Sequence, residues 1–188
     1  MAVNGVAFAS FIASGQTCVA GTRIMVEEAI YDEFVRRLTS KSESIARRMG
    51  SPSHEGSMMG PIISQKQLDG VERLVNAARD QGATIVTGGT RMSGAATLDG
   101  IDLGKGYFYP PTLISGSDNV KVTDTAIWRE EAFGPVLVLA SFKSEDEALA
   151  LANDCDFGLG SACVLFPACL SLGMLNCIWH SIWTQDGS

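Results

Sequence analysis

FIASGQTCVAGTR, residues 11–23, is the most informative stretch of this sequence. Its glycines Gly15 and Gly21 allow the backbone to come close to a bound molecule, and small residues surround Cys18. The stretch ends where an expected strand, Arg23 to Val26, begins. A cysteine presented from such a loop can act as a nucleophile, and its own backbone N–H could face a developing oxyanion. The alternative is that Cys18 is a small buried hydrophobic residue.

EEAFGPV, residues 130–136, is a second informative stretch. It leads into Val136 to Phe142, an apolar and β-branched run that is typical of a sheet strand. Glu131 and Phe133 are candidate binding residues there. The alternatives are that the acidic pair is a solvated helix end or turn, which suits Glu130 best, and that Phe133 belongs to the core.

Two amphipathic helices are predicted between these stretches. Glu27 to Met49 begins with acidic residues, ends with basic ones and precedes Gly50, so it complements its own dipole. A second helix starts at Ser64, where Gln67 completes a capping box, and stops at Gly82. The apolar positions that define these helices are Ile30, Phe34, Leu38, Ile45 and Met49 in the first and Leu68, Val71, Val75 and Ala78 in the second.

Strand and loop patterns alternate with these helices, which favours an α/β fold. Ile85 to Thr87 is a short strand candidate, and Gly88 to Gly106 is a glycine-rich loop. Prolines keep Tyr107 to Leu113 extended. The remaining predicted elements are a helix that Ser144 and Glu147 cap and that runs through Ala152, and a last strand from Ser161 to Phe166.

Composition excludes several classes of partner. The 188 residues include 21 acidic and 14 basic ones, a formal charge of −7, so we expect no nucleic acid partner. The five cysteines form no C-x-x-C pair and are not spaced with the two histidines as metal ligands usually are, so we expect no metal site. An odd number of cysteines is also a poor disulfide framework, which favours a reducing compartment and a cytoplasmic location.

One uncharged run raises the question of a membrane. No Asp, Glu, Lys or Arg occurs from Phe157 through Gln185, which is long enough to cross a bilayer. Pro167, Asn176 and His180 interrupt the run, so a membrane span is not expected.

Both informative stretches resemble segments of the NAD(P)-dependent aldehyde dehydrogenase superfamily, and further matches stand in the family's order. The resemblance covers residues 4 to 166 and implies an α/β fold, a partial catalytic domain with a mostly parallel sheet and flanking helices. The dinucleotide-binding domain would be largely absent. Residues 167–188 match nothing in the family, and we expect an unrelated tail, disordered or mis-translated. The further matches are Tyr107-Phe108, Pro111-Thr112, Ala152-Asn153-Asp154 and Phe157-Gly158-Leu159.

The resemblance implies an oxidoreductase that oxidises a small aldehyde to a carboxylic acid through a cysteine thiohemiacetal and thioester. Cys18 would be the catalytic nucleophile. Glu131 would bind the ribose hydroxyls of NAD or NADP, and Phe133 would pack by the nicotinamide ring.

Other parts of the family's machinery do not occur in these residues. The Glu-Leu-Gly-Gly-Lys type motif that carries the water-activating glutamate is absent, and so is any G-x-G-x-x-G or P-loop pattern. We therefore expect a truncated chain without dehydrogenase turnover of its own. The alternatives are a non-catalytic fragment that associates with full-length relatives or with its own copies, and a residual cysteine esterase.

Overall fold

The computed structural model describes residues 1–164. The whole region for which we expect an unrelated tail, residues 167–188, thus lies outside the described residues, together with the expected domain boundary. The helices are α1 (Ala2–Phe11), α2 (Tyr31–Ala46), α3 (Gln65–Asp80), α4 (Ala126–Arg129) and α5 (Glu145–Asn153), and the strands are β1 (Arg23–Glu27), β2 (Thr84–Thr87), β3 (Thr112–Ser115) and β4 (Val136–Phe142).

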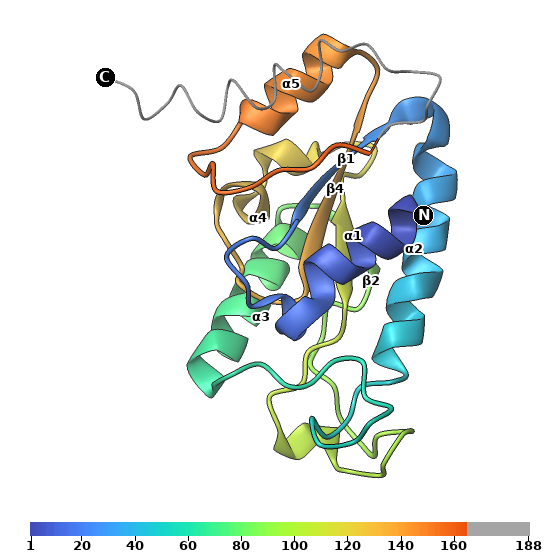
Figure 1. Ribbon diagram of the computed structural model, residues 1–188. Helices are drawn as coiled ribbons and strands as arrows, with labels where there is room; N and C mark the ends of the chain where they lie inside the picture. The colour runs from blue at the N-terminus through green and yellow to red at the C-terminus, as the bar shows by residue number, and fades with distance from the viewer. Residues whose placement is uncertain (165–188) are drawn as a thin grey trace.

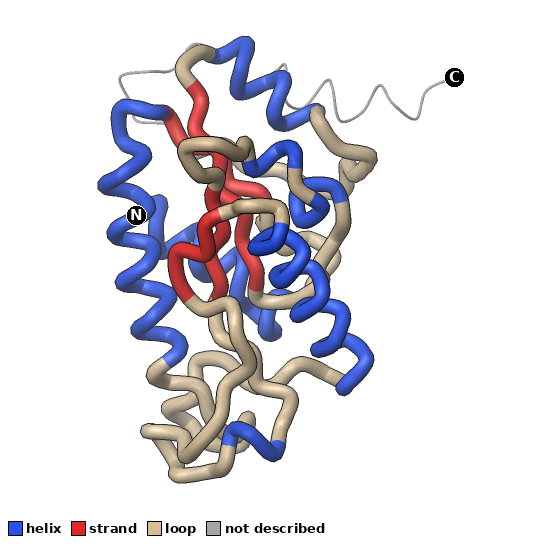
Figure 2. Tube along the Cα trace, turned by 180° about the vertical axis from the view of Figure 1, so that it is seen from behind, coloured by secondary structure: helices blue, strands red, loops and turns tan. Residues whose placement is uncertain are grey.

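The strands form one sheet in the order β1-β4-β3-β2. β1, β4 and β3 run parallel, and β2 is antiparallel to β3 at one edge. Helices α1 and α2 cover one face, while α3 and α4 lie on the other (Figures 1 and 2). Each face has its own hydrophobic core, so both sides of the central strands are buried. The expected α/β architecture with a mostly parallel sheet and flanking helices is confirmed.

The first predicted helix, Glu27 to Met49, forms only in part, as α2. Glu27 belongs to β1, where it pairs with Phe142, and residues Glu28–Ile30 form a 3-10 turn. The side chain of Ile30 is 51% exposed, so this position of the pattern does not face the core. Met49 is buried as predicted but lies beyond the last helical residue, Ala46. Pairing in the sheet therefore overrides the helical pattern at the amino end.

The second predicted helix forms as α3, with one change at its cap. The Ser64 hydroxyl accepts a hydrogen bond from the backbone N–H of Gln67 at 3.2 Å, as a capping box requires. The Gln67 side chain does not return to Ser64 and instead donates to two carbonyl groups far along the chain. The prediction of a reciprocal hydrogen bond between the Gln67 side chain and Ser64 is therefore wrong, because the Gln67 side chain makes a tertiary contact instead.

The last predicted strand is not present in its described part. Residues 161–164 have no strand partner and are largely exposed, and Leu165 and Phe166 lie outside the described residues. An apolar, β-branched run forms a strand only where another strand offers its backbone hydrogen bonds. Val136–Phe142, between β1 and β3, has such partners on both sides.

Gly70 in the middle of α3 gives a direct test of helix propensity. A Cβ at this position would meet no other atom within 4 Å. We expect Gly70→Ala to raise the free energy of unfolding by about 0.5–1 kcal/mol, because alanine loses less backbone entropy than glycine in a helix. Urea denaturation followed by circular dichroism measures this change.

Gly94 is the matched control, because a Cβ there would also meet open space. Its φ of +81° is unfavourable for a residue with a side chain, so Gly94→Ala should lower the free energy of unfolding by about 1–2 kcal/mol. A loss of stability in Gly70→Ala would contradict the helical assignment at that position.

Candidate active site

The loop that carries Cys18 lies at the amino end of β1. Ala13, Ser14 and Gly15 adopt positive φ angles of 49°, 58° and 71°, which turn the chain sharply after α1. Such angles are costly for alanine and serine, so the surrounding structure must hold them. The Cys18 thiol is free and exposed. The alternative of a buried, small hydrophobic cysteine does not fit this exposure.

Hydrogen bonds fix this loop from two sides. The Ser10 hydroxyl of α1 donates to the carbonyl of Gly21 at 2.6 Å, beyond Cys18. The Ser14 hydroxyl donates to the carbonyl of Gly60 at 2.9 Å. The side-chain oxygen of Gln16 accepts from the backbone N–H of Ile63 at 3.0 Å. The loop is therefore tied both to α1 and to the segment that leads into α3.

Glu131 and Phe133 lie between α4 and β4. Phe133 also has a positive φ, 47°, and is half-buried. The Gln67 side-chain amide donates to the carbonyls of Ala132 and Phe133, at 2.9 Å each. A Cβ on Gly134 would overlap the Val71 side chain of α3, so the segment lies directly on that helix.

The two segments meet through their glycines. A Cβ on Gly15 would overlap the carbonyl of Gly134 and lie 2.8 Å from the nitrogen of Pro135. Glycine is therefore the residue that lets the backbone next to the cysteine loop lie against the backbone next to Phe133. β1 and β4 are parallel neighbours, so both segments enter the sheet at the same end. The fold thus brings together the two stretches that the sequence singled out.

The two glutamates of this segment differ in their surroundings. Glu130 forms an ion pair with Arg73 at 2.9 Å, and both side chains are more than half exposed. Glu131 is exposed and has no ion pair or side-chain hydrogen bond among residues 1–164. Its carboxylate is therefore free to accept hydrogen bonds from the hydroxyl groups of a bound molecule.

A polar cluster that the sequence patterns did not predict supports both segments. The Arg23 guanidinium lies 3.9 Å from the centre of the Trp128 ring and donates to the Asp154 carbonyl at 2.8 Å. The Asp154 carboxylate accepts from Arg129 and from the Trp128 indole N–H. These hydrogen bonds, that from Arg129 first, hold the pKa of Asp154 below its usual range. The cluster joins the start of β1 to the helix that leads to Glu131.

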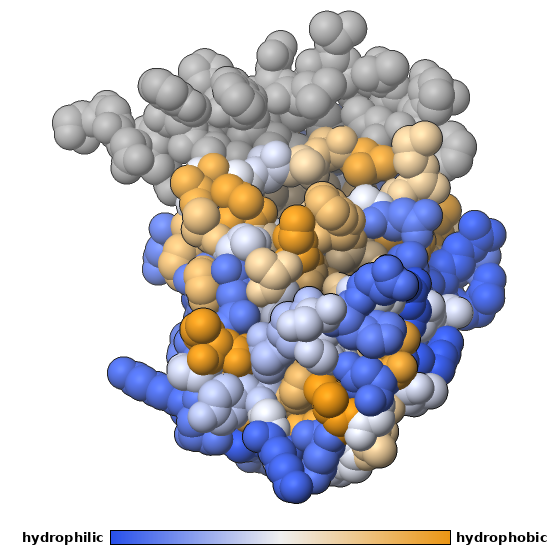
Figure 3. Space-filling view, turned by 60° about the horizontal axis from the view of Figure 1, so that its bottom comes forward, coloured by the Kyte–Doolittle hydropathy of each residue, from blue (hydrophilic) through white to orange (hydrophobic). Residues whose placement is uncertain are grey.

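Exposed apolar side chains flank the cysteine loop. Phe8, Ile12, Val19 and Ile63 are 69%, 44%, 66% and 80% exposed, respectively. Figure 3 shows hydrophobic residues exposed in several patches among hydrophilic ones. Val19 follows the thiol directly, and Ile63 is hydrogen-bonded to Gln16. Val19 and Ile63 thus place exposed apolar atoms close to the cysteine loop.

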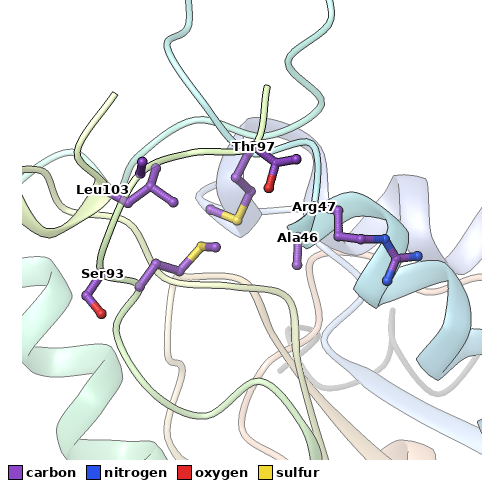
Figure 4. Close-up of a pocket in the computed structure, with 8 residues that line it drawn as sticks. Ala46, Arg47, Ser93, Thr97 and Leu103 are labelled. Atoms are coloured by element: carbon purple, nitrogen blue, oxygen red, sulfur yellow. The ribbon is translucent and has the colours of Figure 1, made fainter. Parts of the chain in front are cut away.

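Two hollows lie elsewhere on the molecule. A cavity of about 230 Å³ separates the end of α2 from the long loop before β3, with Arg47 and Leu103 on its rim (Figure 4). A larger one of about 660 Å³ lies at the carboxyl ends of β3 and β4, where Ser115 and Ser141 line it. Neither is lined by Cys18, Glu131 or Phe133. These three residues precede β1 and β4, so they lie at the amino ends of the strands, away from the larger cavity.

Residues 1–164 offer neither a cluster of metal ligands nor a membrane-spanning helix. No group of three or more histidine, cysteine or acidic side chains is placed to hold a metal ion in this part of the chain. No helix in the same range has both the length and the apolar character needed to cross a bilayer.

Comparison with known proteins matches most of the chain to a single family. The sequence model of the aldehyde dehydrogenase family matches residues 1–165. Chloroplastic betaine aldehyde dehydrogenase of Beta vulgaris is 43% identical over 155 residues, 82% of this chain and 28% of that protein. Peroxisomal aminoaldehyde dehydrogenase 1 of Pisum sativum has the same identity and coverage.

A solved structure agrees with these sequence matches. Betaine aldehyde dehydrogenase from Staphylococcus aureus, in complex with NAD+, superposes with a TM-score of 0.81 and 33% identity. The match covers 96% of this chain and 33% of that one. The chain therefore spans about a third or less of the length of the proteins that it matches.

Proposed function

This chain belongs to the aldehyde dehydrogenase family, and from that membership we propose that its residues supply the nucleophile and part of the cofactor contact for NAD(P)-dependent oxidation of an aldehyde. One observation carries the proposal. The exposed Cys18 thiol lies on a strained loop whose Gly15 is in backbone contact with Gly134, next to Phe133.

Cys18 would act as its thiolate, which is the nucleophilic form of cysteine. Its sulfur forms a bond to the carbonyl carbon of the aldehyde, and the carbonyl oxygen becomes an oxyanion that the Cys18 backbone N–H could stabilise. A bound NAD or NADP would supply the acceptor for the hydride of that carbon, so that Cys18 would then carry the acyl group as a thioester. Water then breaks the carbon–sulfur bond, releases the carboxylic acid and restores the thiol.

Glu131 and Phe133 would contact the nicotinamide half of the cofactor. The Glu131 carboxylate is exposed and has no side-chain partner among the described residues, which fits acceptance of hydrogen bonds from ribose hydroxyl groups. Phe133 is half-buried, and the next residue, Gly134, lies against Gly15 of the cysteine loop, which fits packing of the Phe133 ring against a flat aromatic ring. NAD is the cofactor in the Staphylococcus aureus structure. Both NAD and NADP remain candidates for this chain.

The substrate proposed for this site is an aldehyde that carries an amino or quaternary ammonium group. The relatives that suggest it are named betaine and aminoaldehyde dehydrogenases. We also propose a reducing compartment such as the cytoplasm, because the odd number of cysteines in the sequence is a poor disulfide framework.

The 188 residues contain no glycine-rich dinucleotide motif, so we propose that they support acylation of Cys18 but not turnover with NAD or NADP. Treatment of the purified chain with p-nitrophenyl acetate, followed by mass spectrometry of its peptides, tests this proposal. We expect acetyl groups on Cys18 well before Cys155 or Cys163. Equal rates of labelling at the three thiols would remove the basis for a nucleophilic Cys18.

Association with intact relatives or with a second copy is another candidate role. β1 pairs with β4 on one side, and no strand among residues 1–164 pairs with its other side. An open strand edge can accept a strand from another chain. After co-expression with a full-length relative, a complex should co-migrate in size-exclusion chromatography, and its absence would exclude this role.

A further inference from the structure

The first turn of α3 contacts both halves of the candidate site. On one side, the Ile63 backbone N–H just before this turn donates to the Gln16 side chain of the cysteine loop. On the other side, Gln67 donates to the carbonyls of Ala132 and Phe133. Gln16 and Phe133 belong to segments more than 100 residues apart in the sequence. A single helical turn thus fixes where each segment lies.

We propose that Gln67 is a positioning residue for this site, an inference that rests on the proposed function. Its amide nitrogen lies 2.9 Å from each of two successive carbonyl oxygens, so one side chain fixes the peptide groups on both sides of the Phe133 Cα. Phe133 has a φ of 47°, which a residue with a side chain adopts only when neighbouring groups hold it. Gln67 thereby sets the direction of the Phe133 ring and of the backbone that follows Glu131.

Gln67 also acts on the cysteine loop through Gly134. The carbonyl group that Gln67 holds belongs to Phe133, and the next residue, Gly134, lies against Gly15. If the segment at Phe133 moved, Gly15 would lose its support, and the thiol three residues later would be free to shift. A displacement of about 1 Å at a reacting group can change a rate by about 100-fold.

The cap of α3 does not depend on the Gln67 side chain. Ser64 accepts from the backbone N–H of Gln67, which any substitution except proline retains. Glutamate is also favourable in the first turn of a helix, because its charge complements the dipole. Gln67→Glu therefore removes the two donated hydrogen bonds while keeping the shape of the side chain and the helix itself.

The experiment compares Gln67→Glu with a matched and a rescuing variant in the full chain. Gln65→Glu adds the same charge in the same turn, at an exposed side chain whose hydrogen bond goes to Asp69. Gln67→Lys restores a donor of comparable length. Hydrogen exchange of the peptide spanning residues 131–137, the rate of Cys18 acetylation by p-nitrophenyl acetate and the urea midpoint are measured for each variant.

In Gln67→Glu we expect exchange in residues 131–137 to be about tenfold faster and acetylation of Cys18 about tenfold slower, with the urea midpoint close to that of Gln65→Glu. Gln67→Lys should restore both the exchange rate and the acetylation rate to values close to those of the unmodified chain. Exchange and acetylation in Gln67→Glu equal to those in Gln65→Glu would overturn the inference.

Failure of this inference is distinguishable from failure of the proposed function. If the unmodified chain shows no preference for acetylation at Cys18, the proposed function fails, and exchange at residues 131–137 alone decides whether Gln67 holds the segment. If the unmodified chain does acetylate at Cys18 and Gln67→Glu changes neither readout, Gln67 has no positioning role.

Discussion

Cys18→Ala should abolish the rapid release of p-nitrophenol that we expect when the chain is mixed with p-nitrophenyl acetate. The reason is chemical, because alanine has no group that can accept the acyl carbon. The substitution should leave the free energy of unfolding within about 0.5 kcal/mol of that of the unmodified chain, since the side chain is exposed and free. Stopped-flow absorbance, with the protein at a concentration comparable to that of the ester, measures the amplitude of this burst.

Cys155→Ala is the control for this experiment. Cys155 is also a free thiol, and it lies at the end of α5, where its sulfur contacts the Phe157 carbonyl at 3.2 Å. Its removal should leave the burst amplitude unchanged. A burst that persisted in Cys18→Ala and vanished in Cys155→Ala would show that Cys155 is the reactive thiol, and it would contradict our assignment of this role to Cys18.

Gly15→Ala should slow acetylation of Cys18 by about 100-fold and destabilise the chain. Gly15 has a φ of +71°, which costs alanine about 1–2 kcal/mol. The added Cβ would also overlap the Gly134 carbonyl, so the cysteine loop would have to move away from the segment that holds Phe133. A shift of about 1 Å at the thiol is enough for a loss of this size. The rate of acetylation and the urea midpoint report the two effects separately.

Gly21→Ala is the matched control in the same loop. The nearest atom to a Cβ at Gly21 is the Ala9 Cβ at 3.9 Å, an ordinary contact, and its φ does not lie in the left-handed range. This substitution should change the acetylation rate by less than about threefold, because neither the backbone nor the packing must adjust. If both alanine variants behaved alike, the contact between Gly15 and Gly134 would have no role in placing the thiol.

Local patterns predicted most of the regular elements because the information for them lies in neighbouring residues. Ser64 and Ser144 accept from the backbone N–H three residues later, as their spacing indicates. Val136–Phe142 forms β4 with the predicted bounds. The helix α1 was not predicted, because its apolar residues are not confined to one side.

At the ends of helices and strands, the conformation and hydrogen bonds of a residue depended on contacts with residues distant in the sequence. Glu27 fits a helical start by its charge, yet it ends β1 because Phe142 offers it a partner. Gln67 fits a capping box, yet its side chain binds two carbonyls 65 and 66 residues away. In both cases a partner distant in sequence competes with a local interaction and replaces it.

The sequence by itself determined the family, the α/β class and the two stretches that the candidate site combines. Cys18, Glu131 and Phe133 could be singled out because each stands in a motif of neighbouring residues. Their roles remain predictions. Only the tertiary structure decided that the two stretches touch, because the contact between Gly15 and Gly134 requires β1 and β4 to be parallel neighbours. The physical reason is that glycine, which has no side chain, adds nothing to a hydrophobic or charge pattern in the sequence. The need for glycine becomes visible only when the folded structure shows another backbone in the space that a side chain would fill.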